Sequence, residues 1–532
     1  MKKNIEILPI ALLLLLILTS IPLIVNANDL STHEQKGGTY NYTITVNDEG
    51  EAHIEIEYST SMNRGTSWVL VPKNFTPWEY QVIRGEIIDY SISDAYASSE
   101  EKYVFYNNFT FNFAGKHGFK LLITYNMNYG SIIVEPRGFF YSPQIGFSTK
   151  DEATIFVRFP KSAKLKEEAM LPKPEAISEY DEYFEVTFKI KTNLARIAIE
   201  YTIDKPLNKT IIENDIFHIK TPTRYIDLAE RLLHAYEKVY ENMTEIFAVN
   251  LSDVEVEFFA PTLEDLWIAG FIPFNGTHLG EINLNLFFVR TAVGYWEQIA
   301  IHELVHQFVW TAGISPNILW FHEGLAEYIS YELTLRAGWT GAESKREELE
   351  ALAENLKPNL GFIQKWRPGK QDSNIIAYYA ASYLIVKEIA EENGGLEFYK
   401  CFFNKIKSLG NITTIDTLIH YLSSCSKTDL TSKFAKWGFN IVDIYIVQEA
   451  IKQGKKIVEE QLPIAQPWLF IAKKLLEQAE NALRQGDLKT AIIKASIGET
   501  IAKTSLTLTI ITIAAIILLV LRRIKYEEEI KL

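Results

Sequence analysis

Two histidines and a glutamate lie close together in the segment His302-Glu303-Leu304-Val305-His306. The surrounding stretch, residues 295–310, contains no glycine or proline and has a helical composition. Four residues make just over one helical turn, so both imidazoles would project from one face and bind a single cation. Neutral imidazole suits Zn²⁺. Glu303 would then accept a proton from water at the metal and return it to the leaving amine.

This five-residue pattern needs support from its context, because it arises by chance in on the order of one in a hundred chains of this composition. The alternative is a helix that carries two surface histidines. Apolar residues on both sides of the histidines favour a helix seated in a core, where electrostatic interactions are stronger. These residues are Ile301, Leu304, Val305, Phe308 and Val309.

A third ligand is available in a second segment, Trp320-Phe321-His322-Glu323-Gly324-Leu325-Ala326-Glu327-Tyr328. A turn-rich stretch at 311–317 would let this segment fold back as a helix beside the first. Catalytic zinc keeps three protein ligands and one open position, and two histidines with Glu323 meet that requirement. Gly324 would allow a close helix approach, while His322 would face another side and is not expected to bind the metal.

Glu327 follows Glu323 by one helical turn. It would either orient a liganding imidazole through the free ring N–H or lie as an exposed carboxylate on the helix face. The sequence leaves both interpretations open.

The two segments together resemble the peptidase MA-like gluzincins, a clan that includes the aminopeptidase N relatives, the glycyl aminopeptidases and thermolysin. The resemblance covers about residues 215–440 and is sharp only at these motifs. It implies a mainly helical, thermolysin-like peptidase domain with one Zn²⁺ held by His302, His306 and Glu323. In aminopeptidase N relatives 18 residues separate the second histidine from the glutamate, whereas here there are 16. The chain therefore stands beside that family.

A further match concerns Tyr379-Ala380-Ala381-Ser382, followed by Ile385-Val386-Lys387, which resembles the helix that carries the oxyanion-binding tyrosine in aminopeptidase N relatives. The resemblance implies that the Tyr379 hydroxyl donates to the oxyanion. Tyr378 and Tyr383 are neighbours, and any of the three would also fit a core position.

The amine-binding Gly-x-Met-Glu-Asn strand of those aminopeptidases has no counterpart in residues 270–289. Exopeptidase and endopeptidase action therefore both stay open. What remains is a strand that can pair with an extended peptide through main-chain hydrogen bonds.

Three kinds of element are expected to carry this site, in a multidomain α+β chain. Short alternating runs from Thr39 to Asp204 predict an antiparallel β-sandwich domain over 29–204. A catalytic domain over 210–442 begins with an amphipathic helix at 224–248 and includes strand-like runs at 254–260 and 281–289. A helical stalk over 443–503 contains a hairpin from Gln461 to Lys503.

Both ends of the chain favour export and anchoring. Lys2 and Lys3 precede an uncharged stretch, and residues 1–27 have the pattern of a signal peptide, with the uncleaved segment as an alternative anchor. Residues 504–521 are uncharged and long enough to span a membrane, and basic residues follow at 522–525. These features predict a single-pass protein of the cell membrane, with an extracellular catalytic domain and a cytoplasmic tail over 522–532.

Composition limits the partners. A formal charge of −14 without a basic block argues against nucleic acid. Eight Asn-x-Ser/Thr sequons are compatible with an exported glycoprotein. Cys401 and Cys425 would form one disulfide outside the cell or remain two buried thiols.

The sequence therefore predicts a membrane-anchored extracellular zinc metallopeptidase that acts on a peptide or protein substrate. The alternative is a catalytically silent gluzincin-like protein for surface adhesion or assembly.

Overall fold

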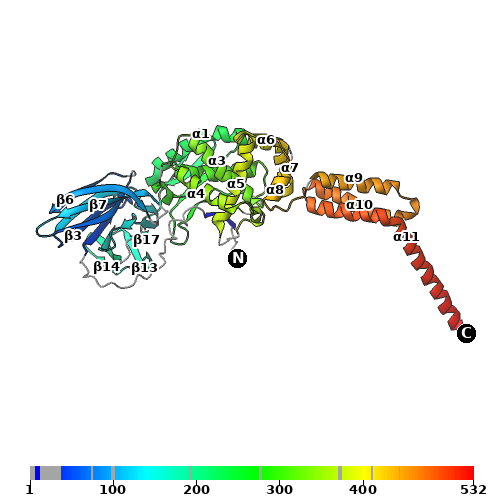
Figure 1. Ribbon diagram of the computed structural model, residues 1–532, viewed down its shortest axis with the longest axis horizontal. Helices are drawn as coiled ribbons and strands as arrows, with labels where there is room; N and C mark the ends of the chain where they lie inside the picture. Colours follow the sequence, from blue (N-terminus) through cyan, green and yellow to red (C-terminus); the bar gives the residue numbers. More distant parts are fainter. Residues whose placement is uncertain are drawn as a thin grey trace. The chain divides into compact units, whose positions relative to one another are not determined.

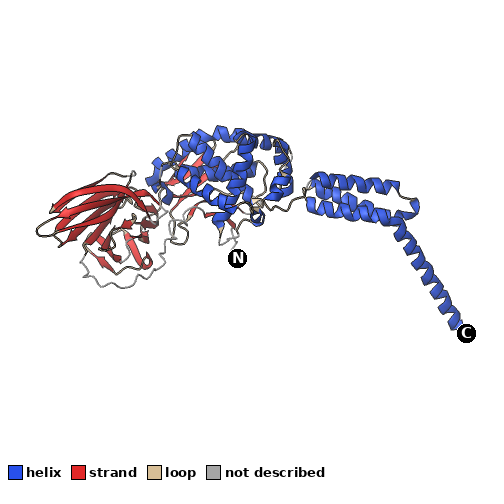
Figure 2. Cartoon of the chain, in the orientation of Figure 1, coloured by secondary structure: helices blue, strands red, loops and turns tan. Residues whose placement is uncertain are grey.

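The computed structural model describes residues 6–11, 37–73, 76–96, 102–190, 194–274, 278–291, 293–369, 374–408, 411–442 and 444–531. Strands dominate the N-terminal part of the chain and helices the C-terminal part (Figure 2), which confirms the predicted β and helical regions. The predicted wholly antiparallel pairing is wrong at one place, because Thr39–Val46 and Glu152–Pro160 pair in parallel. Two compact units are formed. One comprises Met1–Glu241, Leu251–Val305 and Ile329–Glu348, and the other Asn242–Asn250, His306–Tyr328 and Leu349–Leu532.

The N-terminal β region contains several sheets, because strands of period-two pattern bury alternate residues. A seven-stranded sheet has the order β14-β15-β12-β2-β3-β8-β5, and β4-β7-β6, β13-β17-β10-β9 and β11-β16 form the others. In β2, for example, Tyr40, Tyr42, Ile44 and Val46 are all buried. The bounds are β2 Thr39–Val46, β3 Ala52–Thr60, β4 Arg64–Pro72, β5 Trp78–Arg84, β6 Glu86–Tyr96, β7 Lys102–Ala114, β8 Phe119–Met127, β9 Ser131–Val134, β10 Arg137–Tyr141, β11 Ile145–Gly146, β12 Glu152–Pro160, β13 Ala163–Leu171, β14 Ala176–Glu179, β15 Tyr183–Ile190, β16 Leu194–Ala195 and β17 Ala198–Ile203.

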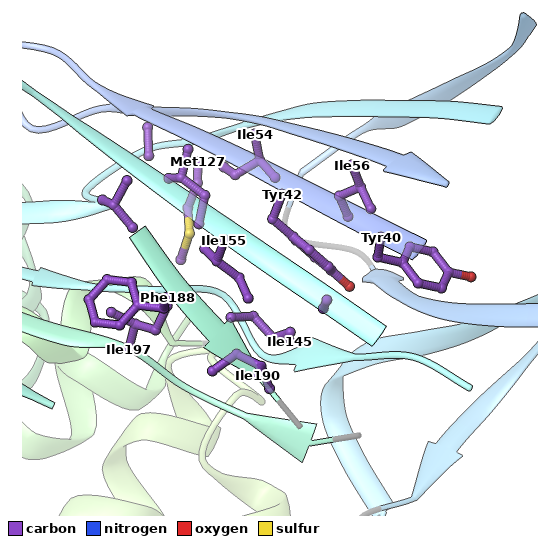
Figure 3. Close-up of a cluster of buried hydrophobic side chains, with 14 of the residues drawn as sticks. Tyr40, Tyr42, Ile54, Ile56, Met127, Ile145, Ile155, Phe188, Ile190 and Ile197 are labelled. Atoms are coloured by element: carbon purple, nitrogen blue, oxygen red, sulfur yellow. The ribbon is translucent and has the colours of Figure 1, made fainter. Parts of the chain in front are cut away.

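A large apolar core fills most of this region, and Leu70, Ala95 and Tyr106 form a smaller one. Figure 3 shows Tyr42, Ile54, Ile155 and Phe188 from different strands directed toward one another. All four side chains are almost fully buried. No residue of the predicted metal site lies here, as the sequence indicated.

A mixed six-stranded sheet follows in the same unit, in the order β1-β21-β22-β20-β19-β18. Strands β19, β20 and β22 are parallel, while β21 runs antiparallel to β22. Strand β1 pairs antiparallel with the other edge of β21, with Ile10 opposite Gly270. The bounds are β1 Glu6–Ala11, β18 Lys209–Glu213, β19 Phe217–Pro222, β20 Val254–Phe259, β21 Ile268–Phe274 and β22 Ile282–Asn285.

The strand-like runs predicted beside the site are only partly strands. Strand β20 matches the first, but β22 ends at Asn285 and Leu286–Arg290 form the 3-10 helix η3. The Asn285 side chain causes this change by accepting a hydrogen bond from the Phe287 N–H at 2.9 Å. Strand β1 falls in the predicted signal peptide, of which residues 1–5 and 12–27 lie outside the described residues.

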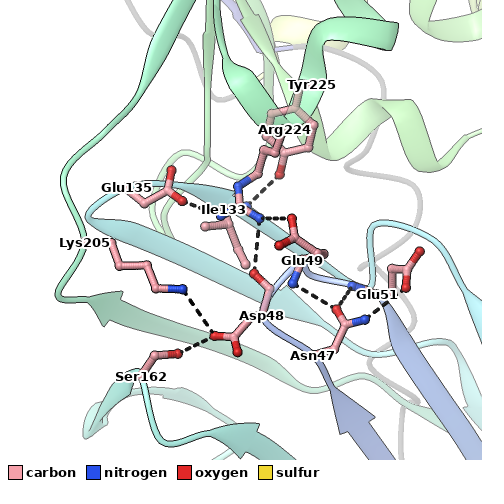
Figure 4. A network of polar contacts seen from close by, with 10 residues as sticks. All are labelled: Asn47, Asp48, Glu49, Glu51, Ile133, Glu135, Ser162, Lys205, Arg224 and Tyr225. Atoms are coloured by element: carbon pink, nitrogen blue, oxygen red, sulfur yellow. Dashed lines mark hydrogen bonds and ion pairs between the residues drawn. The ribbon is translucent and has the colours of Figure 1, made fainter.

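A polar network holds the start of α1 (Ile226–Phe247) against the β region (Figure 4). The Arg224 guanidinium donates to the Asp48 carbonyl at 3.1 Å, to the Glu49 carboxylate at 2.9 Å, and to Glu135. The Tyr225 hydroxyl accepts from the Ile133 N–H at 2.8 Å. These contacts fix the helix that supports the predicted metal-binding helix.

Seven helices follow in the described residues up to 442, and they build the rest of the predicted catalytic domain. Their bounds are α2 Tyr295–Thr311, α3 Leu319–Arg336, α4 Glu343–Leu356, α5 Ile375–Asn393, α6 Leu396–Ile406, α7 Ile415–Cys425 and α8 Thr431–Lys436.

The two cysteines form one disulfide, between α6 and α7, which decides between the alternatives that the sequence left open. The bond closes a loop with a sequence separation of 24 residues. We expect the double variant Cys401→Ser/Cys425→Ser to lose about 3 kcal/mol of unfolding free energy, because the unfolded chain gains loop entropy. Urea denaturation of the two proteins measures this loss. An unchanged midpoint would contradict it.

The C-terminal part is a three-helix bundle of α9 (Ile444–Glu460), α10 (Gln466–Arg484) and the start of α11 (Leu488–Lys531), all shown in Figure 1. The predicted hairpin corresponds to α10 and α11, and α9 adds a third helix to it. The turn between α10 and α11 touches α7, because the Thr414 and Thr417 hydroxyls donate to the Gly486 carbonyl at 2.8 and 3.4 Å. Helix α11 includes one segment apolar and long enough to cross a membrane.

Candidate metal centre

Helix α2 carries the first three predicted site residues, His302, Glu303 and His306, all of them buried. Its apolar neighbours Ile301, Leu304, Val305, Phe308 and Val309 are fully buried too, which confirms that the helix is seated in a core. At its start, the Glu297 carboxylate accepts from the Gly294 N–H at 2.9 Å and pairs with Arg231 of α1. The carboxylate thus caps the helix near its positive end.

The connection from α2 to α3 is a fixed turn. Gly313 adopts a φ of 89°, which the turn requires and a glycine supplies without strain. The Ser315 N–H donates to the Ile412 carbonyl at 2.8 Å, and the Ile412 N–H donates to the Gly313 carbonyl at 2.7 Å. The segment before α7 therefore stabilises this turn through two backbone hydrogen bonds.

Helices α2 and α3 run antiparallel in contact with each other. The Gln298 side-chain amide donates to the Ser330 hydroxyl at 2.8 Å. Further along α2 and earlier in α3, Nε2 of His306 lies 3.5 Å from Oε2 of Glu323. Contacts at two separated points fix the rotation of both helices about their axes.

His302, His306 and Glu323 come together as a buried group that can hold a metal ion, with one potential ligand atom from each lying within 4.8 Å of the others. Two ligands about 2.0–2.1 Å from zinc at a tetrahedral angle lie roughly 3.4 Å apart. The 3.5 Å between His306 and Glu323 matches this spacing. The donor set of two imidazoles and one carboxylate therefore fits Zn²⁺.

Glu303 lies against strand β21, where Gly270 allows a very close approach. A Cβ added at residue 270 would lie 2.6 Å from Oε1 of Glu303 and 3.0 Å from its Cγ. On another side, the Tyr236 hydroxyl of α1 donates to the Ala300 carbonyl at 3.2 Å. Burial, and then the nearby Glu303 carboxylate, raise the pKa of Tyr236 well above its ordinary value. The phenol therefore remains a protonated donor under α2.

Substituting Gly270 tests the predicted role of Glu303 as a base while leaving the predicted metal ligands in place. Gly270→Ala should lower peptide hydrolysis about tenfold or more, because the new methyl group must displace the Glu303 side chain. Gly280→Ala is the matched control, since a Cβ there would lie 3.3 Å from its nearest neighbours. Hydrolysis and zinc content are measured for both variants. Equal activities would contradict the assignment of Glu303.

Gly324 brings α3 onto α5, as the sequence predicted. A Cβ added there would lie 2.5 Å from the Ser382 carbonyl oxygen and 2.8 Å from Cγ2 of Val386. Any larger residue would push the helices apart. The close approach holds Glu323, the neighbouring residue, beside α5.

His322 lies beside the metal-binding group, with its ring stacked on that of His306 at 6.1 Å between centroids, but it is not among the residues that come together as ligands. Its Nε2–H donates to the Ile314 carbonyl at 3.1 Å, in the turn between α2 and α3. Burial, and next the neighbouring His306, lower the pKa of His322 to about 3, so the ring is neutral. Glu327 is buried on α3 one turn beyond Glu323, which excludes an exposed carboxylate. Its role in orienting an imidazole stays a prediction.

The three candidate tyrosines lie on α5 in different surroundings. The Tyr383 hydroxyl donates to the Glu350 carboxylate at 2.7 Å, and the Tyr378 ring packs against Phe362 and Trp366. Tyr379 is fully buried, with its ring edge-on to Trp366 at 4.9 Å. Ser382, which meets Gly324, follows Tyr379 by about one turn. Tyr379 is therefore one turn from the crossing of α3 and α5.

Comparison of the chain with models of known protein families finds no match, and comparison with curated proteins finds none either. Sequence reasoning missed Gly270 and Tyr236, since nothing in their local sequence indicates that the fold brings them to α2.

Proposed function

We propose that the chain is a zinc-dependent peptidase of the gluzincin kind, with a thermolysin-like catalytic domain. The buried group of His302, His306 and Glu323 is the observation that carries this proposal. Burial of carboxylates in an apolar core is costly without positive charge nearby. A divalent cation beside Glu303, Glu323 and Glu327 would supply that charge.

Each residue of the site has a role in hydrolysis. Zn²⁺ bound at the group would polarise the scissile carbonyl and lower the pKa of a water molecule. Glu303 accepts the proton of the attacking water and passes it to the leaving amine. Residues His302, His306 and Glu323 hold the cation, and Glu327 orients an imidazole through its ring N–H.

Strand β21 is suited to hold the substrate backbone beside Glu303. Its edge already accepts an antiparallel strand in β1, with Ile10 opposite Gly270. An extended peptide in the place of β1 would lie along the strand that contacts the Glu303 carboxylate. Cleavage of the predicted signal peptide at residues 1–27, as opposed to its retention as an anchor, would leave this edge open to a peptide. Exopeptidase and endopeptidase action both remain compatible with this arrangement.

Tyr379 is proposed to donate its hydroxyl hydrogen to the oxyanion of the tetrahedral intermediate. Tyr379→Phe should lower kcat about 100-fold with little change in KM, because the lost hydrogen bond forms in the transition state. Tyr383→Phe is the matched control, since that hydroxyl already donates to Glu350. Steady-state kinetics on one peptide distinguish the two. A larger effect at residue 383 would refute the assignment of Tyr379.

We further propose that α11 anchors the protein as a single-pass membrane helix, with the catalytic domain extracellular and residues 522–532 in the cytoplasm. The apolar segment of α11 and the basic residues after it support this orientation. The disulfide between Cys401 and Cys425 is also typical of an oxidising exterior.

The full chain in detergent, loaded with Zn²⁺ and incubated with a peptide library, provides the test. Mass spectrometry should detect new peptide ends that a zinc chelator abolishes. Cleavage that ignores the chelator would refute the proposal. Stoichiometric zinc without any cleavage would instead favour the silent adhesion or assembly protein.

A further inference from the structure

The connection between α9 and α10 exposes large apolar side chains. We define residues 461–470, which include the 3-10 helix η5 (Pro463–Ala465) and the first residues of α10, as the α9–α10 loop. Its exposed apolar residues are Leu462 at 57%, Ile464 at 58% and Phe470 at 68% of full exposure. Exposing three large apolar side chains so close together is unfavourable in water, and such a cluster marks a binding surface.

This loop lies at the same level as the start of the apolar segment of α11. The Ser505 hydroxyl contacts the Gln461 side-chain oxygen at 3.5 Å, and Ala465 and Leu469 share a small core with Ala502. Ser505 and Thr509 are both buried, although they lie inside the uncharged stretch 504–521. From Ile510 to Tyr526 the side chains of α11 are exposed. The first turns of the apolar segment therefore pack against the α9–α10 loop.

Charged residues border the loop on the side away from the apolar segment. Glu459 and Glu460 end α9, and Lys473 and Lys474 follow within one turn of Phe470 on α10. All four are exposed. Exposed apolar side chains bordered by charged ones are the arrangement of an element that enters a lipid interface.

We infer that the α9–α10 loop inserts Leu462, Ile464 and Phe470 into the outer surface of the bilayer that α11 crosses. This inference rests on the proposed anchoring by α11. The continuity of the loop with the apolar segment identifies the occupant as lipid, because a bilayer that takes in the whole uncharged stretch 504–521 also reaches the loop packed beside its first residues. Trp468, which is half-buried on α10 within this loop, is of the residue type enriched at membrane interfaces.

Single spin labels on the full chain in phosphatidylcholine vesicles test this inference. The only native cysteines are bonded to each other, so labels react with introduced thiols. Ile464→Cys and Phe470→Cys report on the loop. Ile493→Cys is the matched control, because this exposed isoleucine lies on α11 about 16 Å before residue 504 at 1.5 Å per residue. Ile513→Cys reports on the proposed span itself.

Collision rates with oxygen, which partitions into lipid, and with a water-soluble nickel chelate give the depth of each label. We expect labels at 464 and 470 to collide severalfold less with the chelate than the label at 493. Chelate access equal to that at 493, with residue 513 shielded, would overturn the inference and leave the anchoring intact. Chelate access at residue 513 as well would refute the proposed anchoring too.

Discussion

Replacing Glu303 with glutamine is expected to lower peptide hydrolysis by at least about 100-fold, because an amide cannot accept the proton of the attacking water. Zinc content should not change, since the predicted ligands are His302, His306 and Glu323. The substitution is nearly isosteric, so the contact with Gly270 on β21 is preserved.

Two measurements on the same preparation check this expectation. Metal analysis of the purified Glu303→Gln chain should give one zinc per chain, and hydrolysis of a peptide identified in the library should fall. Loss of zinc together with activity would place Glu303 among the ligands. Full activity would show that another group acts as the base.

Removal of a ligand should abolish zinc binding and activity together, whereas Glu303→Gln should lose activity and keep its zinc. His306→Ala is expected to weaken zinc binding by more than about 100-fold, a larger effect than the loss of a supporting hydrogen bond around the metal. Glu323→Ala should behave in the same way, since its carboxylate lies 3.5 Å from Nε2 of His306. Both effects can be measured by titration with a fluorescent zinc chelator.

His322→Gln is the matched control for these ligand variants. It removes a buried imidazole of the same segment, but one whose Nε2–H donates to the Ile314 carbonyl. The variant should therefore keep its zinc. If His322→Gln lost zinc while His306→Ala retained it, the assigned ligand set would be wrong.

Much of the site could be predicted because its residues are close in sequence. Helical spacing alone relates His302 to His306, and a short turn relates both to Glu323. The contacts of Glu303 with β21 depend instead on the pairing of distant strands, which no local pattern reports. Gly270 matters because a Cβ there would lie 2.6 Å from Oε1 of Glu303, a contact that only the folded chain creates.

In the fold, too, the elements with a local sequence signal were predicted, and those that depend on distant partners were not. Alternation predicted the β region, and length and periodicity predicted α1, α2, α10 and α11, because each of these signals is local. Strands β18, β19 and β21 were not predicted, since they are short and gain their stability from neighbours in the sheet. Helix α9 was not expected to join the hairpin, because its contacts with α10 and α11 form only in the folded chain and leave no local pattern.

The turn at Gly486 connects α10 to α11. Hydrogen bonds from Thr414 and Thr417 hold this turn to α7, and α11 leaves it as one unbroken helix. The 16 residues from 488 to 503 rise about 24 Å before the apolar segment begins. In the proposed membrane-anchored peptidase these 16 residues would separate the turn held on α7 from the bilayer, so distance from the bilayer, as well as side-chain chemistry, would decide which peptide bonds it meets.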